Sequence, residues 1–411
     1  MTRPHRLYAL GATVIGIHIA DDTLIQPQPG TSRWDHLAGA LVPIALLALA
    51  VWAFPRLRGF PRGALVLLTG ILGSLTAVEA VHYTSTVGAS GDDFTGLLVV
   101  PASLLLIGLG TVTLWTTRRT TGNHAWRYGR RLGFVAGTFL LLGAALMPLG
   151  VAYVNTHAAR SVVPAAQLEA PYENVAFKTS DGLELHGWYV PSHNGAAVIA
   201  FPGRKGPQRQ ARLLARHGYG VLLFDRRGEG ESDGDPNAFG WGGTRDLDAA
   251  IRFLRGRPDV DPGRIGGIGL SVGGEMMLDA AAHGAGLAAV VAEGAGARTA
   301  SEEVSDVPGG VNRALTWLSY HVRDTALEVF GHERPPEDLE RLMGRIAPKP
   351  VFLINAEHGE VGTKQPEYLA AAREPKQAWL VPKGGHTGAI DAMPDEYERR
   401  VIGFLDRTLA S

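Results

Sequence analysis

The sequence predicts two unlike parts: an all-α bundle of membrane-spanning helices over residues 1–157, and an α/β domain with an eight-stranded, mainly parallel sheet over residues 172–411. Three observations lead to this prediction. The N-terminal part contains five long apolar segments, strand and helix signals alternate in the C-terminal part, and a G-x-S-x-G motif stands where one strand signal meets a helix signal.

The composition of the whole chain conceals this division. The 411 residues carry a formal net charge of −1, and 45% of them are hydrophobic. No lysine occurs before Lys178, whereas charges of both signs are dense after it. A near-neutral balance argues against a nucleic-acid partner, because phosphate binding needs an excess of basic residues. The absence of cysteine excludes disulfides, thiolate metal sites and cysteine nucleophiles.

Five N-terminal segments approach the roughly 20 apolar residues that a membrane-spanning helix needs. They cover residues 7–25, 35–54, 63–82, 95–116 and 132–154. The first is the weakest, because Asp21 and Asp22 interrupt it, and a cleaved signal peptide after Arg3 and Arg6 is the alternative. A multi-pass protein of the cell membrane, with the lipid bilayer as a partner, is therefore expected.

The distribution of arginine predicts the orientation of these spans. The second connection contains Arg56, Arg58 and Arg62, and the fourth contains five more arginines between residues 118 and 131. The third connection has no basic residue. Because positively charged loops remain in the cytoplasm, the domain that follows the last span is expected on the extracytoplasmic side.

Residues 158–171, rich in alanine and proline, are expected to form a linker before the α/β domain. Apolar runs bounded by turn residues then predict the strands. These strands are expected at residues 174–178, 183–190, 196–201, 220–224, 264–269, 287–292, 350–356 and 377–381. Helices are expected between most of them, and a helical insertion at 298–345 follows the sixth strand.

The motif Gly269-Leu270-Ser271-Val272-Gly273 marks Ser271 as the candidate nucleophile. A serine on a tight turn from strand to helix has an exposed hydroxyl, and glycine is needed two residues away on each side to avoid a clash. The turn also places Ser271 at a helix N-terminus. There the backbone N–H of Val272 can stabilise a developing oxyanion.

Residues 172–409 resemble the α/β-hydrolase superfamily, and are most similar to its dienelactone-hydrolase-like and serine-aminopeptidase-like branches. The stretch Phe201-Pro202-Gly203-Arg204 stands where the family has a His-Gly-x loop, with Pro202 in place of the histidine. The resemblance implies that the backbone N–H of Arg204 is the second oxyanion donor. The stretch from Asp225 to Ser232 is similar to the family's D-x-R-G-x-G-x-S loop, for which a structural role is implied.

A serine hydroxyl needs a base, and histidine is the usual choice near neutral pH. His386 follows the last predicted strand and precedes the final helix, which is where the fold requires the base. The sequence offers three candidates for the acid of the triad. Glu360 is the first candidate, because the loop after the seventh strand carries the acid in the family. Glu357 and Glu293 are the alternatives.

These features together predict a membrane-anchored serine hydrolase that acts on ester or thioester bonds of a small-molecule or lipid-like acyl substrate, without cofactor or metal. A peptidase or an acyltransferase with the same triad is the alternative, and a non-catalytic membrane sensor is a third. The insertion offers apolar side chains such as Trp317 and Phe330 for a lid over the site, or it is an ordinary helical decoration.

Overall fold

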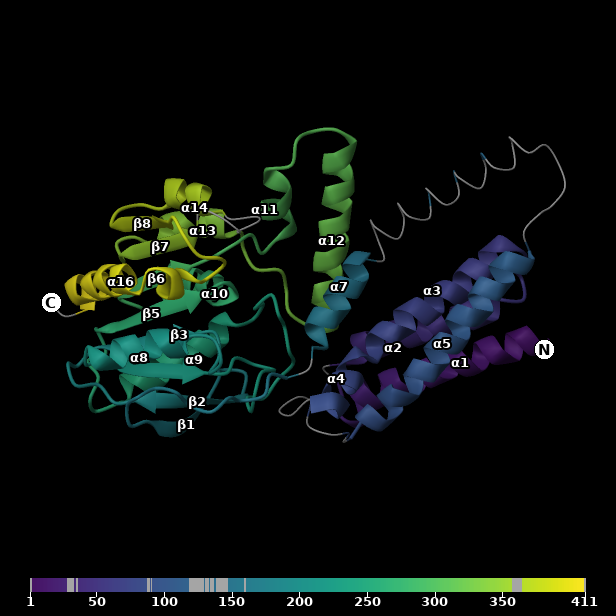
Figure 1. Ribbon diagram of the computed structural model, residues 1–411, viewed down its shortest axis with the longest axis horizontal. Helices are drawn as coiled ribbons and strands as arrows, with labels where there is room; N and C mark the ends of the chain where they lie inside the picture. Colours follow the sequence, from purple (N-terminus) through teal and green to yellow (C-terminus); the bar gives the residue numbers. More distant parts are fainter. Residues whose placement is uncertain are drawn as a thin grey trace. The chain divides into compact units, whose positions relative to one another are not determined.

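The computed structural model describes most of the chain, in two units. The described residues are 2–27, 33–34, 36–86, 89, 91–117, 129, 133, 137, 147–158, 160–356 and 364–409. Unit 1 comprises residues 1–159 and 308–333, and unit 2 comprises residues 160–307 and 334–411. The chain therefore leaves unit 2 for unit 1 within the predicted insertion and then returns (Figure 1).

Unit 2 is built on one eight-stranded sheet, which confirms the predicted α/β-hydrolase class. The strands are β1 (Glu173–Lys178), β2 (Glu184–Val190), β3 (Ala197–Phe201), β4 (Gly220–Phe224), β5 (Ile265–Leu270), β6 (Ala289–Glu293), β7 (Val351–Ala356) and β8 (Lys376–Val381). Their order in the sheet is β1-β2-β4-β3-β5-β6-β7-β8. Strand β2 pairs antiparallel with β1 and β4, whereas β3 to β8 are parallel.

Helices cover both faces of this sheet (Figure 1). The helices of unit 2 are α8 (Gln208–Arg216), α9 (Thr244–Arg255), α10 (Val272–Ala282), α11 (Ala300–Ser305), α13 (Leu339–Ile346), α14 (Gln365–Ala371), α15 (Ala389–Ala392) and α16 (Pro394–Leu409). One hydrophobic core joins the sheet to α9, α10, α13 and α14, and a second joins it to α8 and α16. Successive residues of β3 alternate between them: Ile199 lies in the first core, and Val198 and Ala200 lie in the second.

The expected linker contacts unit 2 along its length instead of running free. The Arg160 guanidinium donates to the carbonyl oxygens of Ser232 and Gly234, the latter at 2.8 Å. Ser161 Oγ donates to Glu229 at 3.0 Å, and Leu168 is buried in the second core. The segment is therefore held against the loop that follows β4.

Unit 1 is helical in the part of it that the structure describes. Its helices are α1 (Arg3–Ala20), a π-helical turn (Asp21–Ile25), α2 (Leu37–Ala53), α3 (Phe60–Thr76), α4 (Val78–Thr86), α5 (Asp93–Thr116), α7 (Met147–Thr156) and α12 (Val311–Gly331). They pack through small residues. An added Cβ at Gly70 would lie 2.8 Å from the backbone nitrogen of Ile107, so α3 and α5 approach closely there.

One of the five expected spans corresponds to a helix long and apolar enough to cross a bilayer. Among the described residues this is α5, where residues 95–116 were predicted. Helices α2 and α3 are apolar but contain only 17 residues each, at the short end of the spanning range. Residues 63–82 are divided between α3 and α4. Most of the fifth segment, 132–154, lies outside the described residues.

The predicted insertion is composed of three helices that belong to different units. Helices α11 and α13 remain with unit 2, whereas α12 lies in unit 1 beside α7. The Phe330 ring meets the Tyr153 ring edge-on, with centroids 5.7 Å apart. Phe330, one of the side chains that the sequence offered to a lid, is therefore packed within unit 1, whereas Trp317 is 52% exposed.

Candidate active site

Ser271 lies between β5 and α10 in a backbone conformation that side chains rarely adopt, with φ at +52° and ψ at −125°. Its N–H donates to the carbonyl oxygen of Glu293 at 2.8 Å, which ties the turn to the end of β6. The strained turn at the carboxyl end of the central strand β5 presents the hydroxyl beyond the carboxyl ends of the parallel strands, as the motif predicts.

The two glycines of the motif are required by close backbone contacts. A Cβ at Gly269 would lie 2.3 Å from the carbonyl oxygen of Gly273. A Cβ at Gly273 would lie 2.7 Å from the backbone nitrogen of Pro202, in the loop after β3. Both distances are far shorter than any real Cβ contact, so a side chain at either position would displace the turn that carries Ser271.

His386 lies in the loop after β8 and reaches the candidate nucleophile. Its Nε2 is 2.8 Å from Ser271 Oγ, within the range that a general base needs. The imidazole lies against the backbone of Gly294, where an added Cβ would be 3.0 Å from the ring Cε1. Gly294 also has a φ of +69°, so both the space and the backbone at this position favour glycine.

Of the three candidates for the acid, the structure describes only Glu293. Glu360 and Glu357 lie outside the described residues, in the part of the sequence that follows Ala356, the last residue of β7. Glu293 is described and is buried at the end of β6. Its Oε1 accepts a hydrogen bond from the N–H of Ala389 at 2.9 Å. Glu293 therefore holds the segment that follows His386, and its role as acid stays a prediction.

The two expected oxyanion donors also differ. Val272 is the first residue of α10, directly after Ser271, so its N–H is at the positive end of the helix. The Arg204 N–H instead donates to Asp225 Oδ1 at 2.9 Å. The Arg204 amide is thus engaged by a carboxylate in this structure, which corrects the expectation that it faces the nucleophile.

Asp225 binds the Arg204 side chain as well as its backbone. The guanidinium Nε donates to Asp225 Oδ2 at 2.8 Å, and both residues are buried. The guanidinium also lies over the Trp188 ring, 5.3 Å from its centroid. The sequence analysis did not predict this ion pair. The signal that could have indicated it is Asp225 itself, the first residue of the D-x-R-G-x-G-x-S loop. The structural role expected for that loop includes fixing the loop after β3.

Glu275 is a buried acid near the site that the sequence did not single out. It lies in α10, one turn after Ser271, and its Oε1 accepts the N–H of Gly296 at 3.1 Å. Burial raises its pKa to about 7, although the hydrogen bond from Gly296 and the nearby Arg298 act in the opposite direction. A glutamate within a helix is usually exposed, so the sequence did not indicate that Glu275 is buried.

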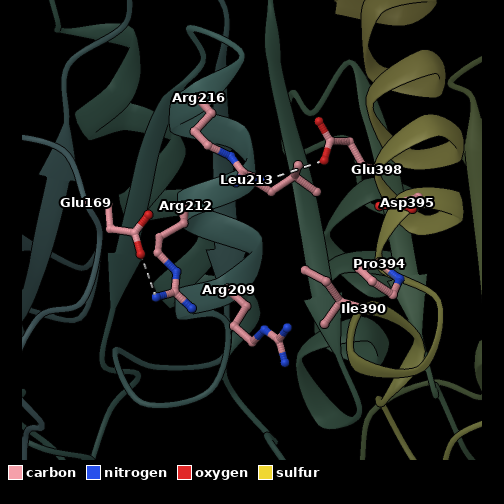
Figure 2. Close-up of a pocket in the computed structure, with 9 residues that line it drawn as sticks. All are labelled: Glu169, Arg209, Arg212, Leu213, Arg216, Ile390, Pro394, Asp395 and Glu398. Atoms are coloured by element: carbon pink, nitrogen blue, oxygen red, sulfur yellow. Dashed lines mark hydrogen bonds and ion pairs between the residues drawn. The ribbon is translucent and has the colours of Figure 1, made fainter.

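A surface hollow of about 390 Å³ lies between α8 and the start of α16 (Figure 2). Three arginines of α8 lie on its wall, and each pairs with an acid. The pairs are Arg209 with Asp391, Arg212 with Glu169, and Arg216 with Glu398. Because the positive charges are matched, the hollow presents no basic excess to an anionic ligand. Among the described residues, no group of three histidines and acids is placed to hold a metal.

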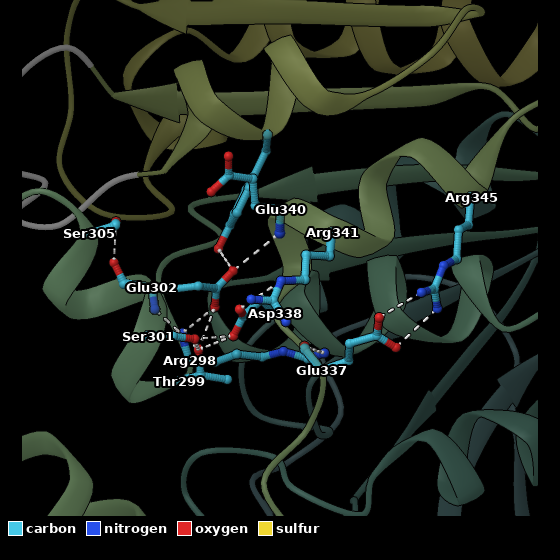
Figure 3. Close-up of polar contacts among 11 residues, drawn as sticks. Arg298, Thr299, Ser301, Glu302, Ser305, Glu337, Asp338, Glu340, Arg341 and Arg345 are labelled. Atoms are coloured by element: carbon cyan, nitrogen blue, oxygen red, sulfur yellow. Dashed lines mark hydrogen bonds and ion pairs between the residues drawn. The ribbon is translucent and has the colours of Figure 1, made fainter.

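A buried polar cluster joins the two ends of the insertion within unit 2 (Figure 3). Thr299 Oγ1 donates to Asp338 Oδ1 at 2.6 Å, next to the start of α13. Glu302 Oε1 accepts from the Glu340 N–H and from the Tyr368 hydroxyl, both at 3.2 Å. Burial raises the pKa of Glu302. Hydrogen bonds of this cluster therefore join the segment that precedes α12 to the segment that follows it.

Residues 147–380, more than half of the chain, match the model of a single protein family. That family is described as X-Pro dipeptidyl-peptidase (S15 family). The chain belongs to this family. With the fold described above, the assignment makes the protein a serine hydrolase of the α/β-hydrolase type.

The chain is also similar to individual proteins. The chain is 32% identical over 235 residues to the Mycobacterium tuberculosis protein Rv2307c, covering 56% of this chain and 75% of the relative. It is 36% identical over 178 residues to the polyketide transferase grgF of a Penicillium species, covering 40% and 55%. A solved esterase of Pyrococcus furiosus has 22% identity and a TM-score of 0.49, with coverage of 61% and 97%.

Proposed function

We propose that this protein is a membrane-anchored serine hydrolase that cleaves ester or thioester bonds through an acyl-serine intermediate. The observation that carries the proposal is the 2.8 Å contact between His386 Nε2 and Ser271 Oγ, two residues 115 positions apart in the sequence. Acyl transfer requires at least a nucleophile and a base at this distance. Here the nucleophile is on a strained turn at the carboxyl end of β5, and the base is in the loop after β8.

In the proposed reaction, Ser271 Oγ attacks the substrate carbonyl carbon while His386 Nε2 accepts the hydroxyl proton. The Val272 N–H, at the N-terminus of α10, stabilises the negative oxygen of the tetrahedral intermediate. His386 then gives the proton to the leaving oxygen or sulfur, and the acyl group remains on Ser271. Water, deprotonated by His386, then attacks the acyl carbon, the bond from this carbon to Ser271 Oγ breaks, and His386 returns the proton to Ser271 Oγ as the acid leaves. Glu360 orients the imidazole, with Glu357 and Glu293 as alternatives.

A peptidase or an acyltransferase is the second candidate, because the family is described by a dipeptidyl-peptidase activity and one relative is described as a polyketide transferase. The same serine and histidine serve all three reactions. A peptidase differs in protonating a leaving amine, and an acyltransferase differs in admitting an acceptor other than water. The shape of the site around the acyl-serine determines which acceptor reaches it.

The N-terminal unit is proposed to be a multi-span membrane anchor that places unit 2 on the extracytoplasmic side. The alternation of arginine-rich and arginine-free connections supports this orientation, and the apolar helix α5 supports a bilayer location. Fusions of alkaline phosphatase and of a cytoplasmic reporter to the C-terminus test the orientation. A bright cytoplasmic reporter with an inactive phosphatase would overturn it.

A fluorophosphonate probe tests the nucleophile directly. The purified protein should be labelled, Ser271→Ala should not be, and Ser180→Ala in the exposed turn after β1 should be labelled like the parent. Turnover of p-nitrophenyl esters of increasing chain length, against X-Pro p-nitroanilides, separates the esterase from the peptidase. Labelling that survives Ser271→Ala would remove the proposed mechanism.

A further inference from the structure

Helix α12 presents an apolar face within unit 1. Leu318, Val322, Val329 and Phe330 follow one another at intervals that place them on one side of the helix. Trp317 adds a flat surface, because the His321 ring stacks on it with centroids 4.1 Å apart. This face does not close completely against its neighbours.

An open groove of about 540 Å³ separates α12 from α2, α3 and α7. Its volume is in the range of about 300–1,000 Å³ that is usual for small-molecule sites. None of the described side chains that line the groove is charged. Thr76, Tyr153, His321 and Thr325 bring the few polar groups, and aliphatic and aromatic carbon forms the remaining wall.

The rim of the groove is continuous with an apolar outer surface. Leu46 of α2 and Trp317 of α12 line the groove, yet they are 60% and 52% exposed. On the same helix as Leu46, Leu41 and Trp52 are also exposed, at 54% and 57%. In water this surface is unfavourable, at about 25 cal/mol for each Å² of apolar area. In a bilayer the same surface would lie against hydrocarbon, where its exposure carries no such cost.

We propose that this groove binds one acyl chain of a bilayer lipid, an inference that rests on the proposed membrane location of unit 1. The uncharged wall selects the chain over the headgroup, since a phosphate or carboxylate inside would lack a counter-charge and burying it alone is costly. The aromatic side chains of Trp317, His321 and Tyr153 give the chain flat contact surfaces. The residues of the groove belong to unit 1, whereas Ser271 and His386 belong to unit 2.

Photo-crosslinking of the full-length protein in lipid nanodiscs tests the proposal. The discs contain a phosphatidylcholine with a diazirine near the end of one acyl chain, and the labelled residues are mapped by mass spectrometry. Labels should concentrate on residues 317–330 of α12 and on Val42 and Leu46 of α2. Free fatty acid with the same diazirine should compete weakly, because the described lining residues include no lysine or arginine to pair with its carboxylate.

Val322→Trp fills the groove and should lower labelling of these residues about tenfold, which corresponds to about 1.4 kcal/mol. The matched control is Val112→Trp in α5, a 59% exposed position outside the groove, which should leave labelling unchanged. Equal labelling of Val322→Trp and Val112→Trp would overturn the proposal, since the lipid would then be contacting the outer surface only.

A second copy of the chain is the competing occupant, and the absence of cysteine makes it simple to detect. Leu318→Cys introduces a single thiol at the groove. Efficient oxidation to a disulfide dimer, with no lipid label, would overturn the lipid proposal. Carbonate extraction separates the two proposals: a released protein refutes the membrane location and the groove together, whereas a retained protein without labels refutes only the groove.

Discussion

Glu275 gives the sharpest stability prediction, because its carboxyl group is buried in unit 2 and its pKa is raised from 4.5 to about 7. Between these two values the folded protein holds a proton that the unfolded chain has released. The stability of the fold therefore falls as the pH rises from about 4.5 to about 7, and it remains lower above that. At about 1.4 kcal/mol for each pKa unit, the full cost is about 3 kcal/mol at pH 8.

The substitution Glu275→Gln removes the titration and keeps an oxygen that accepts the Gly296 N–H. At pH 8 we expect Glu275→Gln to be more stable than the parent by up to about 3 kcal/mol, or about 6–12 °C in the melting temperature of a domain of this size. At pH 5 the difference should shrink to below about 1 kcal/mol, because the folded Glu275 is then neutral and the pH is only about half a unit above the unfolded pKa of 4.5.

Thermal melts in detergent at pH 5, 6, 7 and 8, followed by tryptophan fluorescence, measure this difference. The control is Glu340→Gln, since Glu340 is exposed on α13 and only its backbone takes part in the polar cluster. That variant should shift the melting temperature by the same small amount at every pH. A stabilisation by Glu275→Gln that does not depend on pH, or its absence at pH 8, would refute the reasoning.

Three further changes test the site. Glu360→Gln should lower kcat for a p-nitrophenyl ester by about 10⁴, and near-normal turnover, with a large loss in Glu293→Gln, would move the acid. Gly273→Ala should abolish activity and lower the melting temperature, because its Cβ would meet the loop after β3, whereas Gly309→Ala, in open space, should behave as the parent. Asp225→Asn removes one of the two carboxylates that pair with the buried Arg204 guanidinium, the other being Glu231, and should cost about 1.5–3 kcal/mol in denaturant unfolding, and a loss below about 1 kcal/mol would contradict the buried pair.

The sheet and the turn at Ser271 could be predicted because their signals are local. A run such as Ala197–Phe201 is apolar on every residue and is bounded by turn residues, so it indicates a strand buried on both faces. The motif around Ser271 demands one backbone geometry, and the close contacts at Gly269 and Gly273 show why. Local steric requirements of this kind are expressed in the residues themselves.

The hydrogen bonding of the loop after β3 could not be predicted in the same way. The resemblance implied an oxyanion role for the Arg204 N–H, but it could not tell which group that N–H meets. That is settled by Asp225, 21 positions later in the chain, whose carboxylate takes both the backbone and the side chain of Arg204. The raised pKa of Glu275 has a similar origin, since it depends on what buries the carboxyl group.

Helix α12 shows where the sequence pattern was ambiguous in principle. An apolar face that includes Leu318, Val322 and Phe330 is the same chemistry whether it covers an active site or packs on other helices. The polar cluster of Thr299, Asp338 and Glu302 fixes where the insertion begins and ends in unit 2, and it leaves the intervening helix free to pack elsewhere. Because the apolar face of α12 lies within unit 1, the groove beside it belongs to the N-terminal helices, and a substitution there should alter lipid contact without touching the serine and histidine.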